Sequence, residues 1–481
     1  MSGRGFYSRA VRIVVIVYLL VGAAWTIVNL GDIPHYGDTH TYFQFAQDVR
    51  VNEQRGVVYP WILSQAVHRL LDGQFPGTLH QQQEIEEPDR ECAAPQALAA
   101  VQILQWLVGA AALWFFLRLT VRRNADATTS EPVGRTCLLA LLLLFDPMIN
   151  HFHMAFMTDG LTLAACLAFL AALAAIAERK GSMPLAYCIL VASYLLAGGL
   201  RVEKKWLLLG TFALTSALWA SPKWRSRFPD RLARRLGLAA VLLVVGLASV
   251  VVAQDRSHTR NRGLSSYETF VHLRIGFPHL SEIYEDLPER SKARLSREYA
   301  ELYDTQVNDT RKAVLRATQR DEGARRELAE DVLRTVLPEK WGSILVDSAR
   351  DASENILSTG SLYLRLATWY LGGYKALDRW FFSDGSVWNY QRMAFHHPLI
   401  TGVYVGLGGA LLLLAAPLAW RYARQRKPGP SAALWTPCIV FILLNALFFA
   451  AIFNYVNFRY SLVAHVAFLI FLFRPMIESD P

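Results

Sequence analysis

Charged residues are scarce in this sequence. Only 19% of its 481 residues are Asp, Glu, Lys or Arg, whereas 53% are hydrophobic. A soluble chain normally carries about a quarter charged residues, and one of this length usually divides into several domains. The shortage of charge and the positive mean hydropathy of +0.23 therefore argue against a soluble globular protein and favour a membrane protein.

Cysteine is also scarce, and its placement excludes a disulfide framework. The chain has five cysteines. Four of them fall in or beside long apolar runs: Cys137, Cys166, Cys188 and Cys438. Only Cys92 lies clearly outside such a run. Oxidation of Cys92 would therefore need a second chain.

Long apolar runs are what the sequence has in abundance. A helix needs about 20 such residues to cross a hydrocarbon core of roughly 30 Å. The runs lie near residues 12–30, 97–117, 136–148, 158–177, 184–200, 205–220, 236–253, 398–418, 434–453 and 460–473. We predict an all-α fold, a polytopic transmembrane helix bundle of about ten spans with helical extracytoplasmic loops. The first run lacks a small-residue cleavage site, so we expect a retained signal anchor.

Positive charge predicts the orientation, because Lys and Arg in short loops stay on the cytoplasmic side. With the N-terminus inside, one alternation of the spans places each dense basic loop in the cytoplasm. These loops carry Arg4 to Arg12, Arg118 to Arg135, Arg179 and Lys180, Lys223 to Arg235, and Arg421 to Lys427. Both termini are then cytoplasmic, and we expect a bacterial inner membrane with a periplasmic site. This topology accounts for the net charge of +9, and we expect no nucleic-acid partner.

The spans and loops predict three parts. Residues 1–253 form an N-terminal transmembrane catalytic module with a first extracytoplasmic loop at 31–96. Residues 254–397 form an extracytoplasmic helical loop domain, and 398–481 form the C-terminal transmembrane helices. Within the loop domain, helical periodicity runs from Ser291 to Leu337. The aromatic and basic stretch 362–382 is expected to lie along the membrane interface, beside a lipid-entry groove.

Two acids are expected near the outer membrane surface. Asp38 follows the first span and precedes Tyr42 by one helical turn, and Asp159 begins the fourth span. Two outward carboxylates near one plane can share a polar cavity and act on one substrate. Each acid is equally well suited to the ordinary role of a helix N-cap.

Basic residues also occur on the outer side, where they are unusual. Arg201, Lys204 and Lys205 are spaced to face roughly one way on a helix. We expect a compact cationic patch that binds phosphate, although snorkelling to the interface is the alternative. Arg459 is a second anion partner or a plain helix anchor. The outward histidines lack the spacing of a known metal motif and are better explained by interfacial hydrogen bonding.

The order and sidedness of these features resemble the glycosyltransferase C superfamily, particularly its protein mannosyltransferase and aminoarabinose transferase branches. The matching residues are Asp38 with Tyr42, the Arg-Gly-x-x-Tyr-Pro stretch from Arg55 to Pro60, and Asp159. The family often has paired acids in the first loop, whereas Thr39 follows Asp38 here.

The resemblance implies transfer of a hexosyl or pentosyl group from a polyprenyl-phosphate donor to a glycan, lipid or protein acceptor, with inversion. Asp38 would be the general base, and Asp159 would orient the acceptor or support the oxocarbenium ion. The implied substrate-binding residues are His40, Tyr42, Arg55, Tyr59, His153, Arg201, Glu203, Lys204, Lys205 and Arg459. This scheme does not require a divalent cation such as Mg²⁺ or Mn²⁺.

Two other functions stay open. A glycan polymerase or ligase with a lipid-diphosphate donor would also use outward cations, but its decisive residues would lie in the large loop 254–397. A secondary transporter or flippase would place charges near mid-membrane and break helices in paired halves.

Overall fold

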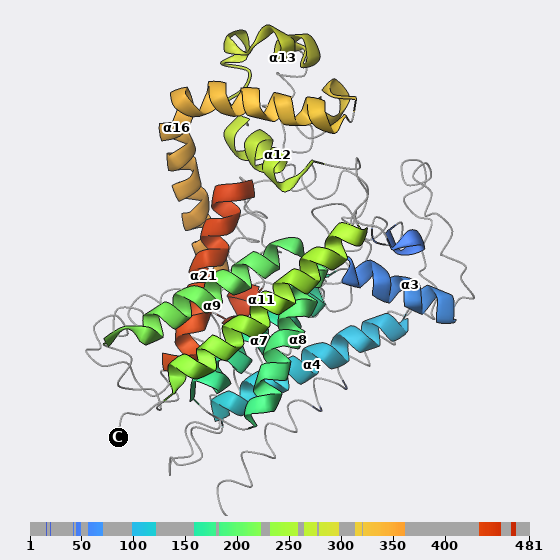
Figure 1. Cartoon of the computed structure of the whole chain (residues 1–481), viewed down its shortest axis with the longest axis vertical. Coiled ribbons are helices and arrows are strands. Elements are labelled where there is room, and N and C mark those ends of the chain that lie inside the picture. Colours follow the sequence, from blue (N-terminus) through green and yellow to red (C-terminus); the bar gives the residue numbers. More distant parts are fainter. Residues whose placement is uncertain are drawn as a thin grey trace, which may run out of the picture.

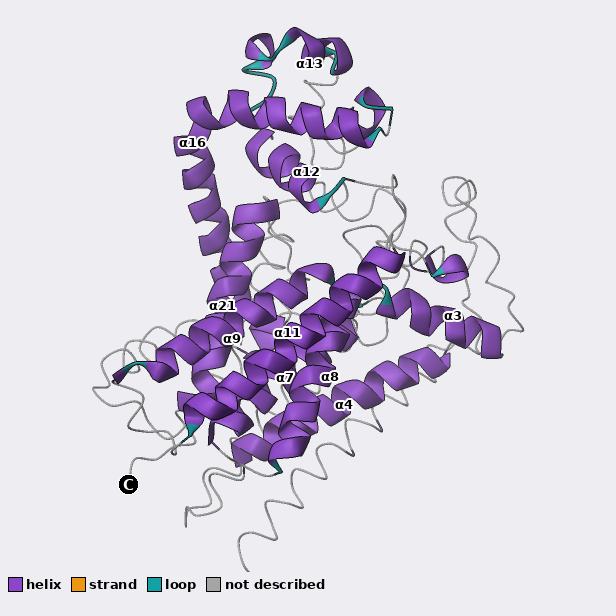
Figure 2. Cartoon of the chain, in the orientation of Figure 1, coloured by secondary structure: helices purple, strands orange, loops and turns teal. Residues whose placement is uncertain are grey.

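The described part of the chain is mainly helical in a computed structural model, with short loops and turns and no strand among those residues (Figures 1 and 2). The structure describes residues 16, 20, 42, 45–49, 56–70, 99–121, 158–178, 182–222, 231–257, 264–276, 279–297, 313–319, 321–360, 432–453 and 463–467. The predicted all-α class is therefore confirmed over this part. The predicted spans at 136–148 and 398–418 lie outside it.

Six of the predicted spans coincide with described helices. These are α4 (Ala99–Val121), α7 (Asp159–Glu178), α8 (Met183–Leu200), α9 (Val202–Ala220), α11 (Leu232–Ser257) and α21 (Ala432–Phe453). Among the described helices, α7, α8 and α11 are long and apolar enough to cross a membrane, and α4 and α21 contain shorter apolar stretches. These helices indicate a membrane protein.

Helix α7 forms the centre of the bundle. Its sequence is apolar on every side, and nearly all of its residues are buried. A helix that is hydrophobic all round must be covered by others, and α4, α8, α11 and α21 all pack against it. At its C-terminal end, Arg235 of α11 donates hydrogen bonds to the carbonyls of Ile176 and Ala177, which satisfies two of the helix's final acceptors.

A second group of helices lies beyond the end of α21 (Figure 1). We call it the helical cap; it consists of α12 (Ser266–Phe270), η3 (Val271–Gly276), η4 (Tyr284–Asp286), α13 (Glu289–Arg294) and α16 (Glu322–Gly360). Its apolar core includes Val271, Leu295 and Val332. Buried polar contacts fix its helices to one another, among them the Arg325–Glu268 ion pair and the capping box of Ser265 with Glu268.

The helical periodicity predicted from Ser291 to Leu337 does not correspond to one helix. Helix α13 ends at Arg294, because Leu295 adopts an extended backbone and buries its side chain in the cap core. Helix α16 then begins at Glu322. The apolar spacing predicted helical structure correctly at 291–294 and 322–337, but it did not indicate the extended residue Leu295 or the turn at 318–319. Residues 298–312 lie outside the described part.

Candidate active site

The structure describes seven of the predicted site residues: Tyr42, Tyr59, Asp159, Arg201, Glu203, Lys204 and Lys205. The other five, Asp38, His40, Arg55, His153 and Arg459, lie outside the described residues.

Tyr42 connects the first loop to the start of α7. Its hydroxyl lies 3.2 Å from Oγ1 of Thr158, the residue directly before Asp159. Its ring meets the ring of Tyr59 edge to face, with centroids 5.1 Å apart. Both tyrosines are buried in one apolar cluster with Leu161 and Leu200. Residues more than a hundred positions apart in the sequence therefore form one packed unit at this end of the bundle.

Tyr59 is held in a single orientation within this unit. It belongs to α3 (Val58–Leu70), and its hydroxyl donates a 3.0 Å hydrogen bond to Oε1 of Gln105 on α4. Burial raises the pKa of Tyr59 well above its usual value, and the nearby Tyr42 and Asp159 raise this pKa further. Tyr59 is therefore a neutral hydrogen-bond donor throughout the physiological pH range.

Gly56 brings the first loop against the junction of α8 and α9. A Cβ atom built on Gly56 would lie 2.0 Å from the carbonyl oxygen of Gly199, and one built on Gly199 would lie 2.4 Å from Cγ2 of Val58. Neither position has room for a side chain. The two backbones approach this closely because both residues are glycine, which places residues 56–60 beside the junction of α8 and α9.

Arg201 is the centre of a buried charge cluster. It is the single extended residue between α8 and α9. Its Nη1 donates to Oδ1 of Asp159 at 2.7 Å, and its Nε donates to Oε1 of Glu203 at 2.6 Å. The two acids lie in the first turns of α7 and α9, where the positive end of each helix dipole favours negative charge. The guanidinium of Arg201 is therefore paired with the carboxylates of both Asp159 and Glu203.

Lys204 points into the interior, toward α21. Its Nζ donates to Oδ1 of Asn445 at 3.3 Å and lies 5.1 Å from the ring centroid of Phe449. The side chain is fully buried. The ammonium is therefore held by an amide oxygen and aromatic faces, with no carboxylate within ion-pair distance among the described residues.

Lys205 points to a different neighbour, on α11. Its Nζ donates to Oε1 of Gln254 at 2.6 Å, and Gln254 in turn donates to the carbonyl of Gly198. The ammonium also lies 5.6 Å from the ring centroid of Trp206. Within the part of the chain that the structure describes, Lys205 also has no carboxylate partner.

These contacts correct the prediction of one compact cationic patch. Arg201 faces two acids, Lys204 faces α21 and Lys205 faces α11. The reason is geometric, because adjacent residues on a helix point about 100° apart and Arg201 precedes the helix. Both acids pair with Arg201, so Lys204 and Lys205 each have an amide partner instead of a carboxylate among the described residues.

The chain matches no protein-family profile, no curated protein and no solved structure. Among the described residues, no group of three His, Cys, Asp or Glu side chains is placed to hold a metal ion.

Sequence reasoning missed the amides that position this site. Gln105, Gln254 and Asn445 each lie in or at the end of a predicted span and each contacts a predicted site residue. A polar side chain inside an apolar span is costly and usually marks function. The signal was therefore present in the sequence as isolated amides within apolar runs.

Proposed function

We propose that the protein is a membrane glycosyltransferase. It transfers a sugar from a polyprenyl-phosphate donor to an acceptor hydroxyl on the extracytoplasmic side, with inversion at the anomeric carbon. The observation that carries the proposal is the contact between Tyr42 and Thr158. It joins the loop that bears one predicted catalytic acid to the helix that begins with the other.

Asp38 is the proposed general base. It precedes Tyr42 by four residues, and four residues of chain span at most about 14 Å. The Asp38 backbone therefore lies no more than about 14 Å from that of Tyr42, and the proposal requires the chain to turn from Tyr42 back toward Asp159. The Asp38 carboxylate accepts the acceptor proton as the acceptor oxygen attacks the anomeric carbon.

Asp159 is better suited to a positioning role than to proton transfer. Its Oδ1 already accepts a 2.7 Å hydrogen bond from Arg201, and this ion pair holds the side chain in one orientation. The Arg201 clamp fixes the start of α7 relative to α9. Asp159 and Glu203 then orient the acceptor and support positive charge that develops on the sugar.

Lys205 is the proposed partner of the donor phosphate. The bond between the anomeric carbon and the phosphate oxygen breaks with its electron pair on the oxygen, so the leaving polyprenyl phosphate gains negative charge. A fixed cation near that oxygen stabilises the transition state. Lys205 has an amide partner rather than an acid, and its charge is therefore available to an anion.

The substitution Asp38→Asn tests the assignment of the base. Loss of a general base lowers turnover by about two to four orders of magnitude, while expression and thermal stability stay unchanged. The matched control is Asp48→Asn, because Asp48 is an exposed acid in the same loop and should give normal turnover. Near-normal transfer by Asp38→Asn would reject the assignment.

A further inference from the structure

The exposed surface of α16 changes its chemistry part-way along the helix. Between residues 321 and 339, charged side chains dominate the exposed positions. The exposed residues there are Asp321, Glu322, Gly323, Arg326, Glu327, Arg334, Leu337, Pro338 and Glu339. Such a surface is typical of a helix that faces water.

Beyond this point the exposed positions are almost free of charge. They are Trp341, Gly342, Ser343, Leu345, Val346, Ala349, Arg350, Ser353 and Ile356. Trp341, Leu345 and Val346 are 62%, 61% and 66% exposed, values that are high for large apolar side chains. Elsewhere in the described part of the cap, Tyr267 and Leu337 are the exposed large apolar residues.

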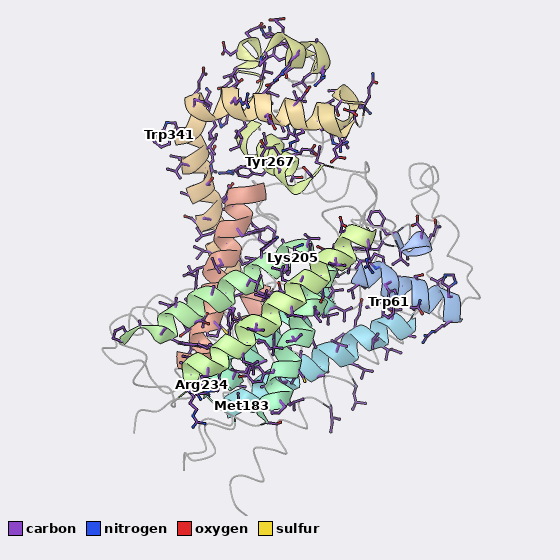
Figure 3. The ribbon with its side chains drawn as sticks, in the orientation of Figure 1. Trp61, Met183, Lys205, Arg234, Tyr267 and Trp341 are labelled. Atoms are coloured by element: carbon purple, nitrogen blue, oxygen red, sulfur yellow. The ribbon has the colours of Figure 1, made fainter. Side chains whose placement is uncertain are left out.

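A bend separates the two surfaces. Pro338 lies inside α16, and proline removes a backbone hydrogen bond and kinks a helix. Figure 1 shows the helix turning and its second half running beside α21. Trp341 points away from the neighbouring helices at the outer side of this bend (Figure 3).

The other side of this second half is firmly packed. Arg274 of η3 donates to Asp351 at 2.8 Å and to the carbonyl of Ile344 at 3.0 Å. Ile344 and Ala352 are buried. The neighbouring helix α21 is apolar from Trp435 to Ala451 and coincides with a predicted span. The second half of α16 therefore runs beside an apolar helix, and Arg350 is the one charged residue among its exposed described positions.

We propose that the face of α16 formed by Trp341, Leu345, Val346 and Ala349 contacts the lipid of the outer leaflet, with Trp341 at the boundary with water. Tryptophan is enriched at that boundary, and apolar side chains on a partly inserted helix are stabilised there. The chain that follows, 362–382, is the aromatic and basic segment expected at the interface. Lipid is the occupant favoured by the packing of this half of α16 against the apolar helix α21. The inference does not depend on the proposed reaction.

Residue-resolved labelling of the full chain in lipid nanodiscs tests this inference. A carbene precursor dissolved in the acyl chains labels residues that contact lipid, and hydroxyl radicals label residues that contact water. Tryptic cleavage after Lys340 and Arg350 isolates residues 341–350, and cleavage after Arg326 and Arg334 isolates 327–334. The second peptide, from the charged half of the same helix, is the internal control.

We expect the 341–350 peptide to take up several-fold more carbene than the 327–334 peptide and several-fold less hydroxyl radical. Strong radical labelling of Trp341 and Leu345 without carbene uptake would show a water-facing surface and overturn the inference. Protection from both reagents would show a protein contact, such as a second copy of this chain, and would also overturn it.

Discussion

Arg201 illustrates how one side chain can hold three chain segments. It binds Asp159 of α7 and Glu203 of α9 and is itself the joint between α8 and α9. All three side chains are about nine-tenths buried or more. The guanidinium therefore cannot be removed without leaving two acids in a site poor in water.

Removal of this cation should be costly. Breaking a buried ion pair from one side costs about 3–5 kcal/mol, so Arg201→Met should lower the thermal stability of the detergent-solubilised protein markedly. Asp159→Asn should lower the stability less, because Arg201 remains paired with Glu203. Arg234→Met is the control, since Arg234 is exposed on α11. A melting temperature for Arg201→Met equal to that of the control would contradict this view of the cluster.

The close backbone approach at Gly56 leads to a second prediction at the residue scale. Gly56→Ala places a methyl group 2.0 Å from a backbone carbonyl oxygen, which must push the first loop away from α8 at a cost of about 1–3 kcal/mol. Gly237→Ala is the matched control, because a Cβ there meets nothing within 4 Å. Alanine should even strengthen that helix by up to about 1 kcal/mol. Thermal unfolding of the two variants measures the difference, and equal stability would mean that the loop does not pack as described.

Helix ends were easier to predict than the partners of the residues that lie there. The sequence placed Asp159, Arg201 and Lys204 at helix ends on one side of the bundle. It did not indicate that Arg201 would meet two acids or that Lys204 would meet Asn445, more than two hundred residues away. Such pairs depend on how the helices pack, and the spacing of residues along one helix carries no information about that.

At the scale of elements, the length and hydropathy of each helix determined whether the sequence predicted it. Long apolar helices such as α7 and α11 were predicted to within a few residues, because their composition alone requires burial or lipid. Helix α3 was missed, since its 13 residues are too short for a span. Helix α16 is polar on average and bends at Pro338, so neither its length nor its two different surfaces followed from a single periodicity.

The cap contains an element whose stability should depend on pH. His272 lies in η3 and is fully buried, and this burial lowers its pKa to about 3 from an ordinary value of 6.5. Between these values the unfolded state binds a proton that the folded state does not. Neutral His272 therefore makes its full contribution to the free energy of unfolding of the cap above pH 6.5. This contribution falls as the pH drops toward 3, by up to about 1.4 kcal/mol per pH unit.

Replacement of His272 separates this effect from others. The melting temperature of the wild type should fall when the pH is lowered from 7 to 5. The melting temperature of His272→Gln should fall less over the same interval. Asp331 does not interfere in this window. Its hydrogen bond from Arg290 lowers its pKa below the ordinary 3.8, so its stabilisation is lost only in stronger acid. Parallel pH profiles for wild type and variant would contradict the assignment to His272.

At the scale of the whole molecule, the membrane class and the positions of six helices followed from the sequence, whereas the arrangement did not. Helix α21 packs against α7, α9 and α16, so a C-terminal helix connects the charge cluster to the cap. That connection depends on contacts between segments hundreds of residues apart. Binary patterns of apolar and polar residues do not specify such contacts.

The most direct test of the proposed function is a donor assay with the purified protein in nanodiscs. A panel of polyprenyl-phosphate sugars would be supplied with and without acceptor extracts, and the release of free polyprenyl phosphate would be measured. The account predicts that one donor is consumed, that consumption is lost in Asp38→Asn, and that it persists in Asp48→Asn. Turnover of a polyprenyl-diphosphate donor alone, or consumption that is indifferent to Asp38, would contradict it.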